Sequence, residues 1–328
     1  YRDTGAALDS LGLPPIEDLF TQWRTDLAND DVADGSFAGR LPAGSYLLIS
    51  KDPARAPSQP VALTVIAGGS VETGVVARRP GGLEVHIRDE AGQALPAKIS
   101  LRPLGDAAAL SLADLGDPYV AGGLSHVAFA ASGSEHMELP QGRYQVYVSR
   151  GVEYSLWDSA EQGNPAGVLV QAGLSTRIDA VLHREVDSSG YISADLHVHA
   201  APSHDSGVPL EKRVATMACE GVEYVVATDH DVITDYRPAL EQVGLDPWLQ
   251  ASSGLEVTGI EVGHYLGFPL LIDHNRPKGG ALDWTGLTPT SVIAGVAELG
   301  SFSPDETIVY IGHPRDGILG YFDQFGFN

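Results

Sequence analysis

The sequence is poor in cysteine, in basic residues and in long apolar runs, and each shortage excludes a class of protein. Cys219 is the single cysteine among 328 residues, so no disulfide can form within the chain. The 20 lysines and arginines are outnumbered by 43 aspartates and glutamates, which gives a formal charge of −23. A surface this acidic repels nucleic acid and anionic lipid, so we expect neither as a partner. No apolar run reaches the roughly 18–20 residues of a membrane-spanning helix, so we expect no transmembrane segment.

Glycine and proline, by contrast, are plentiful. The 38 glycines and 21 prolines predict many turns, as in β-rich domains. The length allows two or three domains of about 100–200 residues each. The chain begins at Tyr1 rather than at a methionine and stops abruptly at Asn328, so we expect a fragment or a processed product.

The first half of the chain contains a repeat. The pattern Leu-Pro-x-Gly-x-Tyr, followed by an apolar strand, begins at Leu41 and again at Leu139. A second pair of similar segments, residues 65–79 and 170–184, follows the two copies. Self-similarity at a fixed spacing indicates tandem copies of one module.

The repeated module is predicted to be β-structure. Leu83–Arg88 and Ala97–Arg102 alternate apolar and polar residues, and Asp89–Gly92 supplies a turn between them. The phrase Gly-Gln-Ala-Leu-Pro-Ala at Gly92–Ala97, together with Leu-Pro-x-Gly-x-Tyr, resembles the transthyretin-like β-sandwich of carboxypeptidase regulatory-like domains. The resemblance implies β-sandwich modules in this half of the chain.

Three regions follow from these patterns. Residues 1–80 are expected to form a partial or atypical first sandwich module, preceded by a helix at Ile16–Leu27, where the apolar residues have helical spacing. Residues 81–187 are expected to form a complete sandwich. Residues 188–328 have a different pattern of apolar residues and are expected to form an α/β domain.

Helices and strands alternate in this last region. Leu210–Glu220 has the pattern of an amphipathic helix that stops at Gly221, and Val222–Ala227 is typical of a buried strand. Ser291–Leu299 and Thr307–Ile311 repeat the pair. This alternation predicts a parallel α/β sheet or barrel, in which chemistry gathers at the carboxyl ends of the strands.

Histidines stand at the ends of these expected strands. His197 and His199 end one strand, His230 follows the next, and His313 follows a third. Because residues two apart in a strand point to the same side, His197 and His199 can clamp one ion between them. Asp195 has the same parity and is expected to hydrogen-bond a ligand histidine.

Two further residues complete the candidate set. Glu256 and His264 follow in the phrases Gly-Leu-Glu-Val-Thr and Gly-His-Tyr-Leu-Gly. A carboxylate among imidazoles suits Zn, Mn or Fe better than Ca. Glu256 is placed to bridge two ions. Glu261 is a competing carboxylate, but its parity is opposite and we do not expect both to reach one site.

These phrases in this order resemble the PHP (polymerase and histidinol phosphatase) superfamily. The shared phrases are Asp-x-His-x-His at 195–199, Thr-Asp-His at 228–230, Gly-x-Glu-Val-Thr at 254–258 and His-Pro-Arg at 313–315. Residues 201–206, 228–236 and 320–326 are similar to its CehA/McbA-like metallohydrolase branch, which includes carbaryl-hydrolase-type enzymes. The resemblance covers about residues 190–328.

The resemblance implies an irregular (β/α)7 barrel that holds two or three divalent metal ions. Asp205 is the family's aspartate after the first motif, with His204 as a rival for that position. The family closes its site with a late Ser-Asp-x-His motif that the given sequence does not contain, so the domain is expected to be truncated. The implied metal ligands are His197, His199, Asp205, His230, Glu256, His264 and His313.

Such a site implies hydrolysis. Divalent ions lower the pKa of bound water to about 7, and the resulting hydroxide attacks a phosphoester, ester, amide or carbamate. Asp229 is expected to orient a ligand or to shuttle a proton. Arg315 either binds an anionic group of the substrate or forms a surface ion pair with Asp316 or another of the many carboxylates.

A second hypothesis is a structural or adhesive surface protein whose metal-binding or degenerate PHP domain does no chemistry. The β-modules resemble those of exported proteins, so the expected location is secreted, periplasmic or at the cell surface, with the cytoplasm as the alternative. A chain with a single cysteine fits an exported protein as well as a cytoplasmic one. The expected partner is a small molecule or an exported polymer as substrate, and self-assembly leaves no pattern in the sequence.

Overall fold

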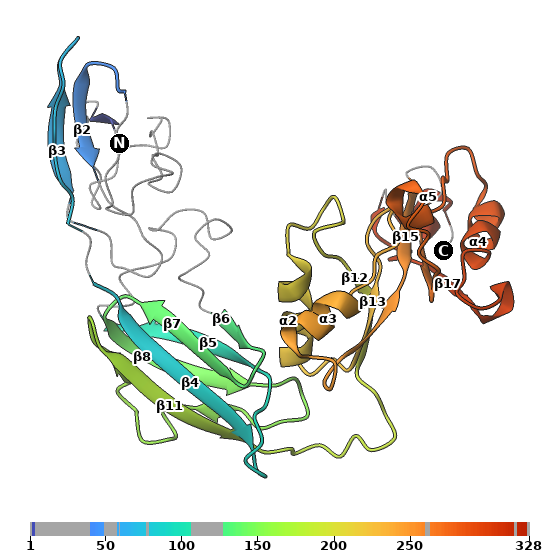
Figure 1. Ribbon diagram of the computed structural model, residues 1–328, viewed down its shortest axis with the longest axis horizontal. Coiled ribbons are helices and arrows are strands. Elements are labelled where there is room, and N and C mark those ends of the chain that lie inside the picture. Colours follow the sequence, from blue (N-terminus) through green and yellow to red (C-terminus); the bar gives the residue numbers. More distant parts are fainter. Residues whose placement is uncertain are drawn as a thin grey trace.

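The computed structural model describes residues 2–3, 40–48, 58, 60–76, 79–105, 127–259, 263–317 and 320–326. The helix expected at 16–27 and Glu261 lie outside these residues. Figure 1 shows three regions in chain order: a small sheet near the N-terminus, a β-sandwich, and a region of short strands and helices.

The small sheet consists of β1 (Arg2–Asp3), β2 (Gly44–Leu48) and β3 (Val61–Val65), which pair antiparallel. The hydroxyl of Tyr46 donates a hydrogen bond of 2.7 Å to the carbonyl of Pro42. In the second copy of the repeat, Tyr144 donates in the same way to Pro140 at 2.8 Å. The repeat Leu-Pro-x-Gly-x-Tyr is therefore a turn that its tyrosine closes, at the start of a strand in both places.

The sandwich contains two sheets. One has the order β10-β8-β5-β6 with β9 added to β8, and the other has the order β11-β4-β7. The described strands are β4 (Gly81–Asp89), β5 (Ala97–Leu104), β6 (Val127–Ala130), β7 (Ser134–Leu139), β8 (Gly142–Ser149), β9 (Trp157–Asp158), β10 (Val168–Val170) and β11 (Ser175–Leu182).

The core of the sandwich follows from the alternation seen in the sequence. Leu83, Val85 and Ile87 of β4 are buried and meet Ile99 and Val146 of the other sheet in one apolar cluster. The residues between them are partly exposed. The expected β-sandwich is confirmed.

The third region starts with a parallel sheet. Strands β12 (Ala194–Val198), β13 (Tyr224–Ala227) and β14 (Gln250–Ser253) lie in that order, joined by the helices α2 (Leu210–Cys219) and α3 (Arg237–Val243). Parallel neighbours require a crossover connection, and each one here contains a helix, as is usual. Helix α2 ends within a residue of the predicted end and packs its apolar face under β12 and β13.

The expectation of parallel strands fails after β14. Strands β15 (Leu255–Gly259), β16 (Gly263–Phe268) and β17 (Ile308–Ile311) form an antiparallel sheet. The connection from Gly259 to Gly263 is too short for a crossover, which takes about a dozen residues. Within the described residues the strands thus make two three-stranded sheets rather than one closed barrel. The remaining elements are η3 (Pro277–Gly280), α4 (Pro289–Ala297), η4 (Pro304–Glu306) and α5 (Tyr321–Gln324).

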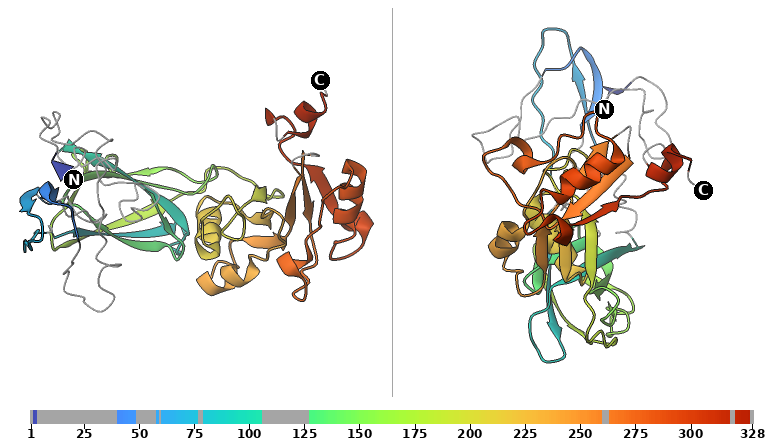
Figure 2. Two further views of the ribbon diagram at one scale, coloured as in Figure 1. Left: turned by 90° about the horizontal axis from the view of Figure 1, so that it is seen from above. Right: turned by 90° about the vertical axis from the view of Figure 1, so that its right-hand side faces the viewer.

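The sandwich is anchored to helix α2, which lies beside it in Figure 2. Arg150, at the end of β8, is buried and donates hydrogen bonds to the carbonyls of Pro96, at 2.7 Å, and of Ala218. Its guanidinium also lies 4.9 Å from the centre of the Trp248 ring. The last turn of α2 has no basic residue of its own, so Arg150 supplies the cation that a helix C-terminus favours.

No helix in the described part of the chain has both the length and the apolarity to cross a membrane.

Candidate metal centre

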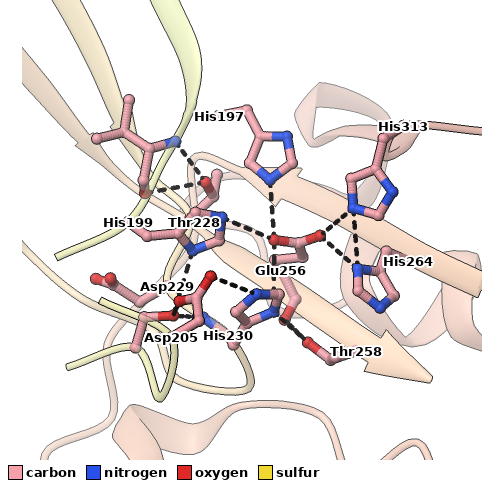
Figure 3. Close-up of polar contacts among 12 residues, drawn as sticks. His197, His199, Asp205, Thr228, Asp229, His230, Glu256, Thr258, His264 and His313 are labelled. Carbon is pink, nitrogen blue, oxygen red and sulfur yellow. Dashed lines mark hydrogen bonds and ion pairs between the residues drawn. The ribbon is translucent and has the colours of Figure 1, made fainter. Parts of the chain in front are cut away.

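The candidate ligands come from both sheets of the third region and meet between them (Figure 3). His197 lies in β12, His199 directly follows it, and His230 lies three residues beyond β13. On the other side, Glu256 lies in β15 and bridges to His230 through the backbone. His264 lies in β16, and His313 follows β17 by two residues.

Five imidazoles surround the carboxylate of Glu256, which is fully buried. Its Oε2 lies 2.9 Å from His197 Nε2 and 3.1 Å from His199 Nε2. His230 Nδ1 approaches the same oxygen at 3.5 Å. As expected, His197 and His199 point to the same side of the strand. Both rings therefore reach the same oxygen atom of Glu256.

The other oxygen faces the remaining two histidines. Glu256 Oε1 lies 2.8 Å from His264 Nδ1 and 3.1 Å from His313 Nε2. These two nitrogen atoms are themselves 3.0 Å apart. The carboxylate is therefore placed between two groups of imidazoles, one at each oxygen.

The charge of this carboxylate is strongly favoured. Burial would raise the pKa of Glu256, but hydrogen bonds from His197, His199 and His264 outweigh it and hold this pKa far below its usual range. Burial lowers the pKa of the His230 imidazole. Burial would also lower the pKa of His199, but its hydrogen bond to Glu256 outweighs burial, and this pKa is raised instead. An ionised carboxylate and neutral imidazoles are the forms that bind a metal.

His230 is held on three sides. Its Nδ1 lies 2.5 Å from the hydroxyl of Thr258, and its Nε2 lies 3.4 Å from Asp205 Oδ2. Its ring stacks on that of His199 at 4.5 Å between centroids. Ser203 accepts a hydrogen bond from the amide of His230 at 3.1 Å and donates to Asp205 at 2.7 Å.

The residues fit metal ions better than they fit protons. If His264 Nδ1 and His313 Nε2 both donate to Glu256, two N–H groups face each other at 3.0 Å. If one keeps its lone pair, it can accept a hydrogen bond from the other, but it then faces the carboxylate with no proton between them. His264 Nε2 is also buried with no partner in the described structure. A cation would accept both lone pairs and the carboxylate together.

The spacing of the donor atoms also suits metal ions. Tetrahedral ligands at about 2.1 Å from an ion lie about 3.4 Å from one another. In three groups of described residues the ligand atoms lie within 4.8 Å of one another. These groups are His197–Glu256–His313, His199–Asp205–His230 and His230–Glu256–His264.

All seven expected ligands therefore lie in one cluster, and Asp205 rather than its rival takes part. His204 is exposed and only stacks on His230, at 4.6 Å between ring centroids. Asp195 differs from the expectation. Its carboxylate accepts a hydrogen bond of 3.1 Å from the backbone amide of His197 and supports the strand rather than an imidazole.

Neither of the two expected catalytic residues reaches the cluster directly. Asp229 is buried, and its Oδ1 accepts hydrogen bonds from the amide of Ala200, at 2.7 Å, and from the hydroxyl of Tyr236, at 3.3 Å. Asp229 thus fixes the backbone next to a candidate ligand. Arg315 pairs with Asp323 at 3.5 Å, which is the surface ion pair with a nearby carboxylate that the sequence left open.

Sequence reasoning missed the side chains that support the ligands. Thr258 has the same strand parity as Glu256, a signal that was present in the sequence. Ser203 and Asp231 lie in loops whose course no periodicity reveals. Tyr310 of β17 donates a hydrogen bond to the carbonyl of Leu196 in β12 and so links the two sheets beside the centre.

The centre is open to solvent rather than enclosed. The side chains of His197 and His313 are 32% and 31% exposed, and that of Asp205 is 46% exposed. A cavity of about 310 Å³ elsewhere on this region is lined by Asp235, Phe302 and neighbours, with none of the candidate ligands among them. A molecule that reaches the cluster therefore arrives from the exposed side.

Comparisons with known proteins give little. No family model matches the sequence, and no curated protein matches it. Three solved structures are weakly similar: a streptococcal ancillary pilin (13% identity, 44% of this chain and 46% of that chain, TM-score 0.24), the TIE protein of Bacillus anthracis (10%, 50% and 27%, 0.21) and a minor pilin of Streptococcus agalactiae (12%, 48% and 66%, 0.23). The chain spans less than half the length of the first two. Scores this low carry no conclusion about fold or function.

Proposed function

We propose that the cluster around Glu256 binds two or three divalent cations, Zn, Mn or Fe, and that the protein is a metal-dependent hydrolase of the PHP type. The observation that carries the proposal is the convergence of five imidazoles on one buried carboxylate. Buried charges in proteins are paired or coordinate metal ions, and a carboxylate with several imidazoles is a donor set that divalent metals use.

Each residue then has a distinct role. Glu256 holds its two oxygens toward different histidines and would bridge two ions. The nitrogens of His197 and His199 face Oε2 and those of His264 and His313 face Oε1, so these histidines would hold the ions together with Glu256. His230 stands between the Oε2 side and Asp205, where the third group of donors lies.

Bound divalent ions would supply an activated water and would polarise the scissile group. The protein positions the substrate around them. Glu256 and His264 form a buried floor, while the exposed edges of His197 and His313 leave one side free for substrate. Catalytic metal sites keep one coordination position for water or substrate, and the solvent access on this side would allow that. The proposed substrate is a phosphoester, an ester, an amide or a carbamate.

The PHP relationship and a location outside the cell belong to the same proposal. The order of the ligand motifs supports the first, together with the parallel strands β12, β13 and β14, whose carboxyl ends carry or lead to three of the ligands. The sandwich ahead of the centre supports the second, because such modules are common in exported proteins.

One observation favours the alternative, a metal centre that only stabilises a surface protein. His197, His199 and His230 come from the parallel sheet, whereas Glu256, His264 and His313 come from the antiparallel sheet. Ions bound between them would cross-link the two sheets. A purely structural centre would leave the protein without hydrolytic activity even when fully loaded.

The two functions are separated by one set of measurements. Metal content is determined by mass spectrometry on the wild type, on Glu256→Gln and on His183→Ala, a control that removes an exposed histidine of the sandwich. The same samples are assayed with p-nitrophenyl phosphate, bis-p-nitrophenyl phosphate and p-nitrophenyl acetate. The proposal expects hydrolysis of at least one substrate by the wild type and the control, and its loss in Glu256→Gln. Bound metal without any hydrolysis would favour the structural alternative, and no bound metal would contradict both.

A further inference from the structure

A residue next to His230 has an unusual backbone conformation. Asp231 has a φ of +53°, in the left-handed region that residues other than glycine rarely adopt. Aspartate and asparagine tolerate this region better than most residues do. Strained backbone of this kind persists only where the surroundings impose it, so its contacts identify what it serves.

The carboxylate of Asp231 is fixed by two donors. Its Oδ1 accepts a hydrogen bond of 3.1 Å from the amide of Thr258 and one of 3.0 Å from Nε1 of Trp284. Its own amide donates to the carbonyl of Glu256 at 2.8 Å. Asp231 thus ties the loop after β13 to strand β15, on which the bridging carboxylate stands.

Trp284 brings a third segment to this junction. It belongs to the chain between η3 and α4 and packs partly buried against the apolar cluster under β15 and β16. Its indole N–H reaches out of that cluster to Asp231. The packing of the ring against the core therefore fixes the indole N–H, and this N–H in turn fixes the carboxylate of Asp231.

The contacts of Asp231 extend through Thr258 to the imidazole of His230. The amide of Thr258 is held by Asp231, and the hydroxyl of Thr258 lies 2.5 Å from His230 Nδ1. The same hydroxyl donates to the carbonyl of Glu256 at 3.3 Å. A hydroxyl fixed in this way determines the tilt of the His230 ring, and so the direction of its lone pair.

We propose that Asp231 and Trp284 are positioning residues that aim His230 at its metal ion. This inference rests on the proposed function of the centre. Partners that orient a metal-binding histidine typically change metal affinity about 10–100-fold when they are removed. The effect acts through His230 and not through contact with the substrate.

The test uses metal binding by the full chain, with variants that separate the backbone from the carboxylate. Asp231→Gly keeps the left-handed backbone but removes the acceptor. Asp231→Asn keeps both an acceptor oxygen and a residue that tolerates this conformation. Trp284→Phe removes the indole N–H together with part of the ring, and Trp248→Phe is the matched control, because it makes the same change where the ring packs on Arg150 at the sandwich.

Two readouts report on the centre directly. Titration with Co²⁺ gives the affinity and the visible absorption spectrum, which depends on ligand geometry. Titration with Zn²⁺, which does not quench tryptophan by itself, gives any change in indole emission. Thermal melting of each metal-free variant shows whether it is folded.

We expect Asp231→Gly and Trp284→Phe to bind Co²⁺ about 10-fold or more weakly and with an altered spectrum. Asp231→Asn restores most of the affinity, and Trp248→Phe binds as the wild type does. The Zn²⁺-dependent change in emission occurs in the wild type and in Trp248→Phe but disappears in Trp284→Phe.

The outcomes separate this inference from the proposed function. Wild-type affinity and spectrum in Trp284→Phe, while the wild type binds metal and hydrolyses substrate, would overturn the inference and leave the hydrolase standing. Equal weakening in Asp231→Asn and Asp231→Gly would also overturn it, because the asparagine keeps the contacts. If the wild type binds no Co²⁺, both ideas fail.

Discussion

The arginine that joins the sandwich to helix α2 gives the sharpest stability prediction. Arg150 is 4% exposed and reaches from the end of β8 to the carbonyls of Pro96 and Ala218. We consider Arg150→Met, which keeps the apolar stem but removes the guanidinium. The two carbonyls then lose a charged donor at a buried boundary, and Trp248 loses its cation.

The size of the loss follows from these contacts. A hydrogen bond from a charged group contributes about 1.5–3 kcal/mol, and the cation over the Trp248 ring adds about 0.5–2 kcal/mol. Burial lowers the pKa of Arg150, which shows that desolvation opposes part of this gain. We therefore expect a loss of about 3 kcal/mol, near the low end of the sum.

The matched control is Lys98→Met at the same boundary. Lys98 Nζ lies 2.6 Å from Glu220 Oε1, but the two side chains are 27% and 39% exposed. Pairs this exposed contribute about 0–1 kcal/mol. The two variants remove the same formal charge and differ mainly in burial.

Thermal melting followed by circular dichroism measures both. For 150–250 residues, 1 kcal/mol shifts the melting temperature by about 2–4 °C, so Arg150→Met is expected to melt about 6–12 °C below the wild type. Lys98→Met should stay within about 4 °C. Equal melting of the two variants, or a wild-type melting temperature for Arg150→Met, would refute the role given to this arginine.

Three further predictions follow. Burial raises the pKa of Tyr144 to about 12, above its unfolded value near 10, so the folded chain keeps a proton that the unfolded chain releases. Stability should fall as the pH rises from about 10 to about 12, and melting curves of Tyr144→Phe should show a smaller fall. Gly254→Ala should lower stability by about 1–3 kcal/mol in urea titrations, because its Cβ would lie 2.9 Å from the carbonyls of both Ala227 and Gly267. Thr258→Val should weaken Zn²⁺ binding about 10-fold in calorimetric titrations, whereas Thr258→Ser, which keeps the hydroxyl, should bind almost as the wild type does.

Local patterns predicted the elements well. Strict alternation placed β4 and β5, and the helix pattern placed α2 within a residue of its observed end. These features depend on neighbours in the chain, which a sequence shows directly. The pairing of the strands depends on the length of the connections instead, and the parallel expectation ignored how short the link between Gly259 and Gly263 is.

The cluster of candidate ligands was predictable for a related reason. Residues at the ends of neighbouring strands meet at one edge, so the positions of His197, His230 and Glu256 in the sequence already suggest their meeting in space. Contacts that cross the fold carry no such signal. Arg150 reaches Ala218, and Trp284 reaches Asp231, only because separate segments happen to pack together.

The most direct test of the metal centre is crystallographic. Crystals of the full chain soaked in Zn²⁺ are measured at wavelengths on either side of the zinc absorption edge, and the anomalous difference map locates each ion. We predict at least two peaks, one beside each oxygen of Glu256, with ligands drawn from the histidines that surround this carboxylate. A map with no peak at Glu256, or with a single peak that its two oxygens do not share, would contradict it.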